Sequence, residues 1–482
     1  MEAILSIISI KVLFGAGLIV AHLFGILLSI DSVLRTQSAQ GAIAWAISLN
    51  TLPYIAVPLY FVFGRNKFHG YIKARYSKNV ELTHITKRLL GNSRERNTIF
   101  KVNKSRDNVM AYLAGMPFTS GNKAELLING DETFNSIFEA IDAAKRYILV
   151  QFFIIEDDYL GRRLKAKLLK KSKEGVRIYF IYDEIGCHNL SNKYLSEIKK
   201  SNIHVTPFNT TRGKNNRFQL NFRNHRKSVV VDGKIAFIGG HNVGDKYLGL
   251  NPKIGDWRDT HVKVEGPAVQ SIQICFTEDW YWATSKIPNL NWDPIPVRGS
   301  DLKVLVAGSG PADNFETCNL MFMNAINNAK HRIWITSPYF VPDKPILTSL
   351  QLASLRGVDV RIMLPEKPDQ ILAHLSAFSY IKETEKFGVK FYRYQPGFLH
   401  QKVMLVDDDL ATIGTANFDN RSFRLNFEIT LLFLSRSFVS KIEKMLENDF
   451  FNCRQITSAD FDNKPIWHKF AIRFARLLAP VQ

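Results

Sequence analysis

Two long apolar runs near the start of the chain predict membrane-spanning helices. Ile4–Ile30 contains only Lys11 and His22 as ionisable residues, and Gly41–Gly64 is a second apolar run. At about 1.5 Å of rise per residue, each run can cross a hydrocarbon core of about 30 Å. The short link Asp31–Gln40 joins the two runs. We therefore expect residues 1–64 to form a two-helix transmembrane hairpin.

A cleaved signal peptide is the alternative interpretation of the first apolar run. The chain starts with Glu2 instead of a basic segment, and a second apolar run follows, so both features argue against a signal peptide. Cationic side chains crowd the segment after the second run: Arg65, Lys67, Lys73, Arg75, Lys78, Lys87 and Arg88. The positive-inside bias then places the C-terminal part in the cytoplasm. This basic linker, residues 65–123, either binds anionic headgroups or serves only topology.

From residue 124 the chain alternates strand-like and helical patterns, and it does so twice. The first half predicts strands at Glu125–Asn129, Tyr147–Ile155 and Val176–Tyr182 and helices at Asp131–Lys145 and Arg162–Lys173. The second half predicts strands at Leu302–Ala307, Ile333–Ser337 and Val358–Leu364 and helices at Phe315–Ala329 and Ile346–Leu355. We therefore predict an α/β fold with two duplicated mixed-sheet domains, residues 124–297 and 298–482, related by a pseudo-twofold.

The last predicted helix, Ile466–Leu478, carries an apolar stripe. Trp467, Phe470, Phe474 and Leu477 recur at helical spacing, and basic residues occupy other positions around the helix. Such a helix can lie in a membrane interface. A terminal helix packed on its own domain has the same stripe, and this is the interpretation we favour.

One polar motif occurs in each half at the same late position. His225–Asn242 reads HRKSVVVDGKIAFIGGHN, and His400–Asn417 reads HQKVMLVDDDLATIGTAN. Each apolar run after the His and Lys is strand-like, so these two side chains project from one face. Asp232 with Gly233 is a hairpin-turn signal, and the returning strand brings Asn242 back beside the His and Lys. Matched spacing in both copies favours a functional role over a structural one.

Composition narrows the class of partner. The chain has 482 residues, a formal net charge of +19 and only four cysteines, Cys187, Cys275, Cys318 and Cys453, without paired spacing. The charge indicates an anionic partner, either nucleic acid or lipid. The cysteines form neither a disulfide framework nor a zinc site, which fits a reduced, cytosolic setting. The apolar runs at the start of the chain favour lipid over nucleic acid.

Both motifs together supply the groups that one phosphodiester needs. The set is His225, Lys227 and Asn242 from the first motif and His400, Lys402 and Asn417 from the second. Ammonium and amide groups donate to nonbridging oxygens, where negative charge accumulates during substitution. One imidazole can attack phosphorus while the other, protonated, gives its proton to the leaving alkoxide. Because the cations are built in, we expect no metal and no cofactor.

Four carboxylates accompany the motifs. Asp232 and Asp407 complete the two motifs, and their place at strand turns favours structural support over proton transfer. A nucleophilic His also needs an acceptor that orients its other nitrogen. Asp259 follows the first motif and Glu428 follows the second, so we expect these two carboxylates to orient the histidines.

The duplicated His-x-Lys-x4-Asp motif resembles that of the phospholipase D superfamily and is most similar to its bacterial cardiolipin synthase family. Further similar stretches are Gly255–Asp259, Ser337–Asp343 and Asn417–Phe423. The resemblance implies a multi-pass bacterial membrane enzyme that transfers a phosphatidyl group between two phosphatidylglycerol molecules and releases glycerol. It also implies that His225 is the nucleophile, that His400 is the acid and later base, and that both lysines and both asparagines hold the phosphate.

The residues leave three other functions open, and they leave a homo-oligomer open as well. A membrane-bound phospholipase D would let water open the phospho-histidine. A nuclease of the same superfamily is disfavoured by the two apolar runs, so we expect no nucleic-acid partner. A lipid-binding scaffold without activity is disfavoured by the two intact motifs. We expect phosphatidylglycerol and other anionic phospholipids as partners.

Overall fold

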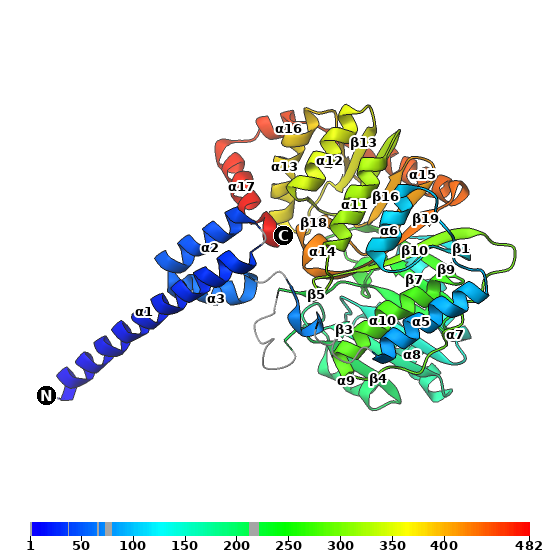
Figure 1. The fold of residues 1–482 in the computed structure, drawn as a ribbon, viewed down its shortest axis with the longest axis horizontal. Coiled ribbons are helices and arrows are strands. Elements are labelled where there is room, and N and C mark those ends of the chain that lie inside the picture. Colours follow the sequence, from blue (N-terminus) through cyan, green and yellow to red (C-terminus); the bar gives the residue numbers. More distant parts are fainter. Residues whose placement is uncertain (1, 37, 65–66, 73–79, 212–220) are drawn as a thin grey trace. The chain divides into compact units, whose positions relative to one another are not determined.

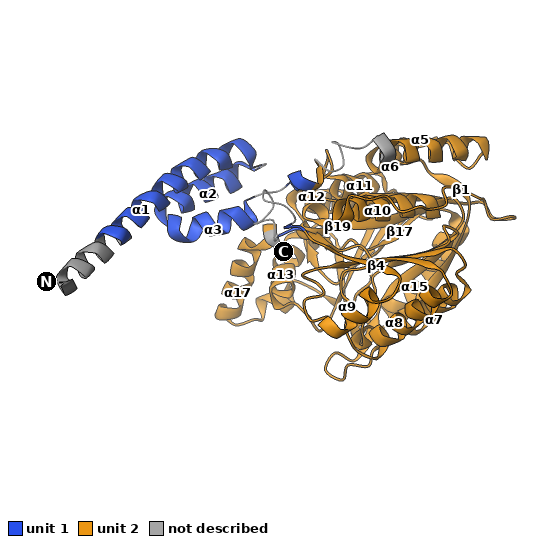
Figure 2. Ribbon diagram, turned by 90° about the horizontal axis from the view of Figure 1, so that it is seen from below, with its two compact units in different colours: residues 1–70, 210–222 blue, residues 71–209, 223–482 orange. Residues whose placement is uncertain are grey.

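A computed structural model describes residues 2–36, 38–64, 67–72, 80–211 and 221–482. The chain divides into two compact units (Figure 2). Unit 1 comprises residues 1–70 and 210–222, and unit 2 comprises residues 71–209 and 223–482. Both copies of the repeated motif lie in unit 2, so the two halves of the predicted duplication share one compact body.

Unit 2 is built on one mixed sheet, in which sixteen strands are found among the described residues (Figure 1). Outwards from the centre, the first repeat runs β1 (Thr119–Ile128), β9 (Thr260–Glu265), β7 (Ile235–Gly239), β6 (Ser228–Val231), β2 (Tyr147–Phe152), β3 (Arg177–Asp183) and β4 (Ile203–Phe208). The second repeat runs β10 (Leu302–Ser309), β19 (Asn426–Leu434), β17 (Leu410–Gly414), β16 (Val403–Val406), β11 (Arg332–Thr336), β13 (Asp359–Pro365), β14 (Lys390–Tyr394) and β20 (Cys453–Ile456). The repeats join where β1 pairs antiparallel with β10. The same order on both sides confirms the predicted duplication and the mixed sheet.

Helices cover both faces of the sheet because strand side chains alternate between faces. In the first repeat these are α7 (Asn129–Ala143), α8 (Tyr159–Lys173), α9 (Asn192–Lys199) and α10 (Ala268–Thr284), and in the second α11 (Thr317–Asn328), α12 (Lys344–Leu355), α13 (Ile371–Glu385) and α15 (Arg436–Phe451). Ile148 of β2 faces the core under α7 and α8, whereas the Tyr147 hydroxyl donates to Gln273 of α10 at 2.7 Å. In the second repeat Trp334 of β11 lies edge-on against Phe450 of α15.

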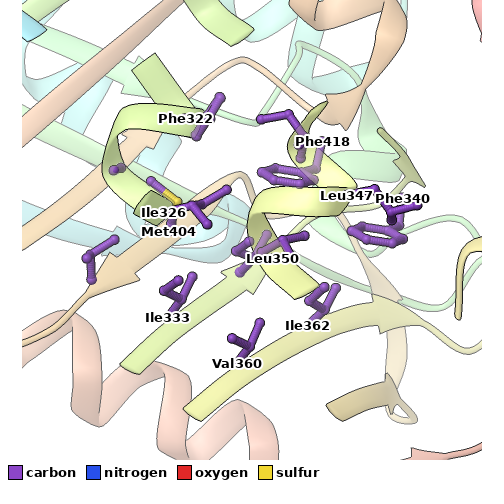
Figure 3. Close-up of a cluster of buried hydrophobic side chains, with 14 of the residues drawn as sticks. Phe322, Ile326, Ile333, Phe340, Leu347, Leu350, Val360, Ile362, Met404 and Phe418 are labelled. Carbon is purple, nitrogen blue, oxygen red and sulfur yellow. The ribbon is translucent and has the colours of Figure 1, made fainter. Parts of the chain in front are cut away.

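The second repeat has its own apolar core between α11, α12 and the sheet (Figure 3). The members labelled in Figure 3 come from α11, α12 and five strands: Phe322, Ile326, Ile333, Phe340, Leu347, Leu350, Val360, Ile362, Met404 and Phe418. Burial of each large apolar side chain contributes about 1.5–3 kcal/mol. Helices α8 and α12 begin at equivalent aspartates, Asp158 and Asp343, whose carboxylates accept backbone N–H groups of the first turn. These rigid cores position the strands that carry the motifs.

Both motif aspartates hold the strand next to their own hairpin. Asp232 and Asp407 have φ values of 54° and 50°, and each begins the turn that links the two motif strands. The Asp232 carboxylate accepts the backbone N–H groups of residues 145–147 at 2.7–2.9 Å. Asp407 accepts those of residues 330–332 at 2.8–3.2 Å. These residues lead into β2 and β11, and their sequences are alike: residues 144–146 read Ala-Lys-Arg, and residues 329–331 read Ala-Lys-His.

The stretch expected to be a linker, residues 65–123, contains regular structure. Helices α5 (Val80–Glu95) and α6 (Ser105–Ala114) lie in it, and β1 begins at its end. Arg106 of α6 is buried and forms an ion pair with Asp409 of the second repeat. Of the basic residues predicted here, Arg65, Lys73, Arg75 and Lys78 lie outside the described residues. Residues 80–123 therefore belong to unit 2 and form regular structure there, instead of a linker.

Unit 1 contains α1 (Glu2–Arg35), α2 (Ala39–Thr51) and α3 (Pro53–Phe63). Among the described residues, one helix is long and apolar enough to cross a membrane, and its candidate span is Gly15–Arg35. The second predicted span is wrong as one continuous helix. It breaks at Leu52, whose φ of −134° and ψ of 57° are not helical, because a residue before proline is disfavoured in the helical region.

The two short helices run down α1 and back. Asn50, near the end of α2, donates to Ser29 at 2.7 Å, and a Cβ at Gly25 would lie 2.2 Å from the carbonyl oxygen of Leu49. Tyr60 of α3 then donates to Asp31 at 3.0 Å. Since α2 starts beside the C-terminal end of α1 and α3 returns to the level of Asp31, the second apolar run turns back partway along α1.

The C-terminal helix α17 (Ile466–Leu477) buries the face opposite to the one that we expected. Ile472 and Ala475 are buried, whereas Trp467, Phe470, Phe474 and Leu477 are 53–75% exposed. The guanidinium of Arg476 lies over Tyr380 of α13 and bonds Glu383, which fixes the inward face. The helix thus packs on its own domain, as predicted, but the prediction that the aromatic stripe makes this contact is wrong.

Replacing Asp407 with Asn should lower the stability of unit 2. Asn tolerates a positive φ, so the change removes only the charge and one acceptor oxygen from the three N–H groups before β11. We expect a loss of about 2 kcal/mol, seen as a lower melting temperature of the purified protein. Asp408→Asn is the matched control, because its exposed ion pair with Arg332 contributes less than about 1 kcal/mol. Equal effects of the two changes would contradict this assignment.

Candidate active site

Each motif histidine directly follows a short strand that pairs with a strand of the other repeat. β5 (Arg223–Asn224) runs parallel to the start of β19, and the His225 N–H donates to the Phe427 carbonyl at 2.9 Å. β15 (Gly397–Leu399) runs parallel to β8 (Asp256–Arg258), and the His400 N–H donates to the Arg258 carbonyl at 2.8 Å. The backbone of each repeat therefore fixes the histidine of the other.

The side chain of each histidine also bonds a carboxylate of the other repeat. Nδ1 of His225 lies 2.9 and 3.0 Å from the two carboxylate oxygens of Glu428, and Nδ1 of His400 lies 2.7 Å from Oδ2 of Asp259. Both carboxylates are fully buried. A carboxylate on Nδ1 fixes the ring so that Nε2 is the nitrogen left to react. The sequence selects these two carboxylates, but the exchange between repeats is visible only in the structure.

The lysines of the motif turn back onto the histidine backbone. Nζ of Lys227 donates to the His225 carbonyl at 2.7 Å, and Nζ of Lys402 donates to the His400 carbonyl at 2.6 Å. Both lysines are buried. The asparagines differ: Oδ1 of Asn242 accepts the Ile154 N–H at 3.0 Å, whereas Oδ1 of Asn417 is buried without a hydrogen-bond partner.

One cavity of about 320 Å³ joins the two motifs. Both histidines and both asparagines line it: His225, His400, Asn242 and Asn417. The rings of Phe153 and Trp257 lie 5.0 Å from the rings of His225 and His400, respectively. Of the other predicted residues, Asp259 and Glu428 bond the two histidine rings, and Lys227 and Lys402 bond the histidine carbonyls without lining the cavity. Asp232 and Asp407 do not line the cavity either, and their backbone contacts agree with the expected structural role.

Sequence reasoning missed other residues of the cavity wall. These are Phe153, Ile154, Arg223, Lys246, Tyr247, Ile254, Tyr339, Val341, Asp369, Gln370, Ala373, Asp419, Arg421, Asn426 and Gln482, with Trp257. Five of these residues, Trp257, Tyr339, Val341, Asp419 and Arg421, fall inside stretches that carry the family resemblance, which was the available signal. The place of the others depends on the tertiary fold.

Burial shifts the pKa values of the two histidines and the two lysines towards their neutral forms. Burial lowers the pKa of His225 to about 4, and Glu428 offsets this only in part. Burial and the charge of Lys402 hold the pKa of His400 well below its usual range. Burial also lowers the pKa of Lys227 to about 7 and that of Lys402 to about 8. Both imidazoles are therefore neutral at neutral pH when no anion is bound.

The two repeats differ at the residue that contacts each buried carboxylate. A Cβ at Gly240 would lie 2.1 Å from an oxygen of Asp259, so only glycine allows that carboxylate to reach His400. The equivalent residue in the second repeat is Thr415, whose hydroxyl donates to Glu428. The Gly-Gly and Gly-Thr pairs of the motifs thus accommodate Asp on one side and Glu on the other.

A buried pair of imidazoles with lysine and asparagine donors, built from two repeats on one mixed sheet, defines a protein of the phospholipase D superfamily. A family model described as "Cardiolipin synthase, PLD-like domain" matches residues 137–280 and 322–450. Cardiolipin synthase A of Pseudomonas putida strain GB-1 is 47% identical, and the match covers 97% of this chain and 98% of that protein. Cardiolipin synthase A of Pseudomonas entomophila is 46% identical over the same shares. The chain belongs to the cardiolipin synthase family of phosphatidyltransferases.

A solved structure supports the fold alone. The phosphatidylserine synthase of Haemophilus influenzae Rd KW20 superposes with a TM-score of 0.62 at 15% identity. It covers 79% of this chain and 100% of that chain. The likeness shows the arrangement of the repeats on one sheet, and it carries no argument about substrate.

The exchange of carboxylates can be tested by a double-mutant cycle. In a His400→Gln background with residual activity, Asp259→Asn should cost little more, because its partner ring is already absent. Glu428→Gln in the same background should still slow phosphatidyl transfer about 10- to 100-fold, because it acts on His225. Turnover of the wild type, the three single variants and the two double variants measures the coupling. The reverse pattern would show that each repeat orients its own histidine.

Proposed function

We propose that this protein transfers a phosphatidyl group from one phosphatidylglycerol to another, forming cardiolipin and glycerol. The observation that carries the proposal is one cavity lined by both motif histidines, each backed by a buried carboxylate. Membership of the cardiolipin synthase family supports the same substrates and does not favour the hydrolytic alternative. One phosphodiester replaces another, so no activated nucleotide donor is needed.

In the first step Nε2 of His225 attacks phosphorus of the donor lipid. The bond from phosphorus to the glycerol headgroup oxygen breaks, and His400, protonated in the substrate complex, gives its proton to that oxygen. Glycerol leaves, and the phosphatidyl group stays bound to His225. The Glu428 carboxylate stabilises the positive charge on the ring.

In the second step His400, now neutral, removes the proton from a headgroup hydroxyl of the acceptor phosphatidylglycerol. The hydroxyl oxygen attacks phosphorus, the bond from phosphorus to nitrogen breaks, and cardiolipin forms. Lys227, Lys402, Asn242 and Asn417 donate to the nonbridging oxygens in both steps, where they stabilise the developing charge. Oδ1 of Asn417 is an unpartnered acceptor, so it is also suited to bind a substrate hydroxyl.

Product analysis with labelled phosphatidylglycerol tests the proposal. The wild type should yield cardiolipin and glycerol, and His225→Ala should yield neither. His400→Ala should slow both steps and leave a phosphatidyl-enzyme that can be recovered after a quench. Undiminished turnover of His400→Ala, or phosphatidic acid as the main wild-type product, would contradict the assignment.

Anion binding should be coupled to proton uptake. The pKa of His225 is about 4 and that of Lys227 about 7 in the empty site, and an entering anion favours the protonated forms, so it raises these pKa values. Protons are therefore taken up between the empty-site and bound-site pKa values, and affinity falls as pH rises through that window.

Sulfate is a suitable probe for this coupling because it does not titrate near neutrality. Calorimetry from pH 6 to 8 in buffers of different ionisation enthalpy should show net proton uptake and weaker binding at higher pH. His400→Gln should reduce the uptake. Affinity that is independent of pH, without proton uptake, would contradict the electrostatic account.

We further propose how the chain sits in the bacterial cell membrane. Residues 1–64 anchor the protein, and residues 65–123 connect them to the repeats at 124–297 and 298–482. A single crossing by Gly15–Arg35, with α2 and α3 as a re-entrant pair, is supported by their return to the level of Asp31. Lys67, Lys87 and Arg88 favour a cytoplasmic position for the repeats.

This topology predicts opposite sides for the two ends of the chain. A tag at the N-terminus should be cleaved by protease added to spheroplasts, and a tag at the C-terminus should be protected until the cells are lysed. A hairpin of two full crossings would protect both tags. The comparison of the two tagged chains therefore decides between one crossing and two.

A further inference from the structure

Five large apolar side chains lie exposed on one face of α17. They are Ile466, Trp467, Phe470, Phe474 and Leu477, which are 53–83% exposed and form the outer face of this helix. At about 100° per residue, all five fall within a sector of about 100°. Among the described residues, no other helix of unit 2 exposes more than two large apolar side chains. Single exposed apolar residues are common, whereas a gathered face marks a binding surface.

The opposite face of α17 holds the helix on its own repeat. Ile472 and Ala475 are buried, and the guanidinium of Arg476 contacts Tyr380 and Glu383 of α13. The two helices lie side by side in both views of the chain (Figures 1 and 2). Because these contacts fix the rotation of α17 about its axis, they also fix the direction of the outer face, which points away from the core of the repeat.

The charge next to the outer face is positive. By helical position, Lys469 and Arg473 lie along one edge of this face, and residues 463–482 contain no acidic side chain. Arg473 is exposed and Lys469 is half-exposed. An apolar face with Trp and Phe and a cationic edge is the pattern of a helix that lies in the interface of an anionic membrane.

A lipid surface suits the outer face better than a second copy of the chain. A face-to-face pair of α17 helices would bring the cations of Lys469 and Arg473 together, and like charges across an interface are unfavourable. The helix has 12 residues, about 18 Å, so it can lie in a bilayer surface but cannot cross it. The candidate span Gly15–Arg35 supplies a separate membrane attachment, so a second contact forms at high effective concentration.

The segments next to the outer face also form part of the cavity wall. Gln482, just after α17, lines the cavity, and its side-chain amide donates to the Ala475 carbonyl at 2.9 Å. In the first turn of α13, Ala373 lines the cavity, whereas Ile371 and Leu372 are exposed. The first turn of α13 therefore adds exposed apolar side chains at the rim of the cavity.

We propose that the outer face of α17 inserts into the interface of an anionic bilayer and holds the rim of the cavity at the level of the lipid headgroups. The inserted surface lies outside the cavity, so this inference goes beyond the proposed function. The benefit to turnover rests on the proposed function, because it requires that the substrates are membrane lipids.

Contact with lipid can be measured without turnover. Full-length protein is reconstituted into vesicles of phosphatidylcholine and phosphatidylserine, with a fluorophore attached through Phe470→Cys. Cys453→Ser removes the half-buried native thiol. Doxyl groups on the acyl chains should quench this label, because the outer face is inserted. Tyr112→Cys is the matched control: its side chain is 73% exposed, against 71% for Phe470, and it lies on α6, away from α17 in both views (Figures 1 and 2).

The outcomes of this measurement are distinct. Quenching at position 470 and not at position 112 supports the proposal. Lys469→Gln combined with Arg473→Gln should raise the fraction of phosphatidylserine needed for half of the full quenching. No quenching at position 470, or equal quenching at both positions, would overturn the proposal. A label at position 470 that is shielded from water but not quenched by lipid would show that a protein surface covers the face, and this result also overturns it.

Turnover gives a second test. Phe470→Glu should lower cardiolipin formation in phosphatidylglycerol vesicles about 10-fold, because a charge replaces an inserted ring. The same variant should keep the wild-type melting temperature and near wild-type turnover of dispersed short-chain phosphatidylglycerol, since neither needs the membrane contact. Tyr112→Glu should leave all three at the wild-type level. An equal loss with vesicles and with dispersed lipid would overturn the proposal. If the wild type formed no cardiolipin, the proposed function would fail, and the quenching result would still decide the inference.

Discussion

The exchange of histidine and carboxylate between repeats is the constraint on which this structure depends. A buried carboxylate that loses its partner is costly, and both Glu428 and Asp259 have theirs on the opposite repeat. The backbone pairs β5 with β19 and β15 with β8 impose the same exchange on the main chain. Neither repeat alone can satisfy its own site, so the cavity exists only when both are folded together. This agrees with the compact unit that contains both repeats.

The two repeats share some contacts and differ in others. Asp232 and Asp407 do the same work in each repeat, since each fixes the segment before the central strand of its half. Gly240 and Thr415, at equivalent positions, differ because a shorter and a longer carboxylate stand behind them. The scaffold is therefore symmetric, whereas the surroundings of the two imidazoles are not. In the proposed mechanism, that asymmetry allows two chemically identical rings to take different roles.

Local patterns predicted the local elements well. Strands β6 and β16 form at the apolar run that was predicted to be a strand after the His and Lys of each motif, because a short apolar run that ends at a turn signal leaves little freedom. The break at Leu52 was also encoded, since Pro53 disfavours a helical residue before it, but the length of the apolar run outweighed that signal in our prediction. The crossed pairing and the direction of the stripe on α17 depend on contacts between distant segments. Periodicity reports that a helix has two faces, and it does not report which face its neighbour covers.

The proposed mechanism asks two imidazoles that are both neutral to act as an acid and a nucleophile. Two carboxylates, Asp259 and Glu428, bond the histidine rings, and two lysines, Lys227 and Lys402, bond the histidine carbonyls, so the charges of these four groups balance when both histidines are neutral. A phosphodiester brings one negative charge into this buried space, and one proton restores the balance. In the proposed mechanism this single proton lies on His400, and His225 remains the nucleophile. Burial strengthens that division because charges in a cavity with little water are poorly screened.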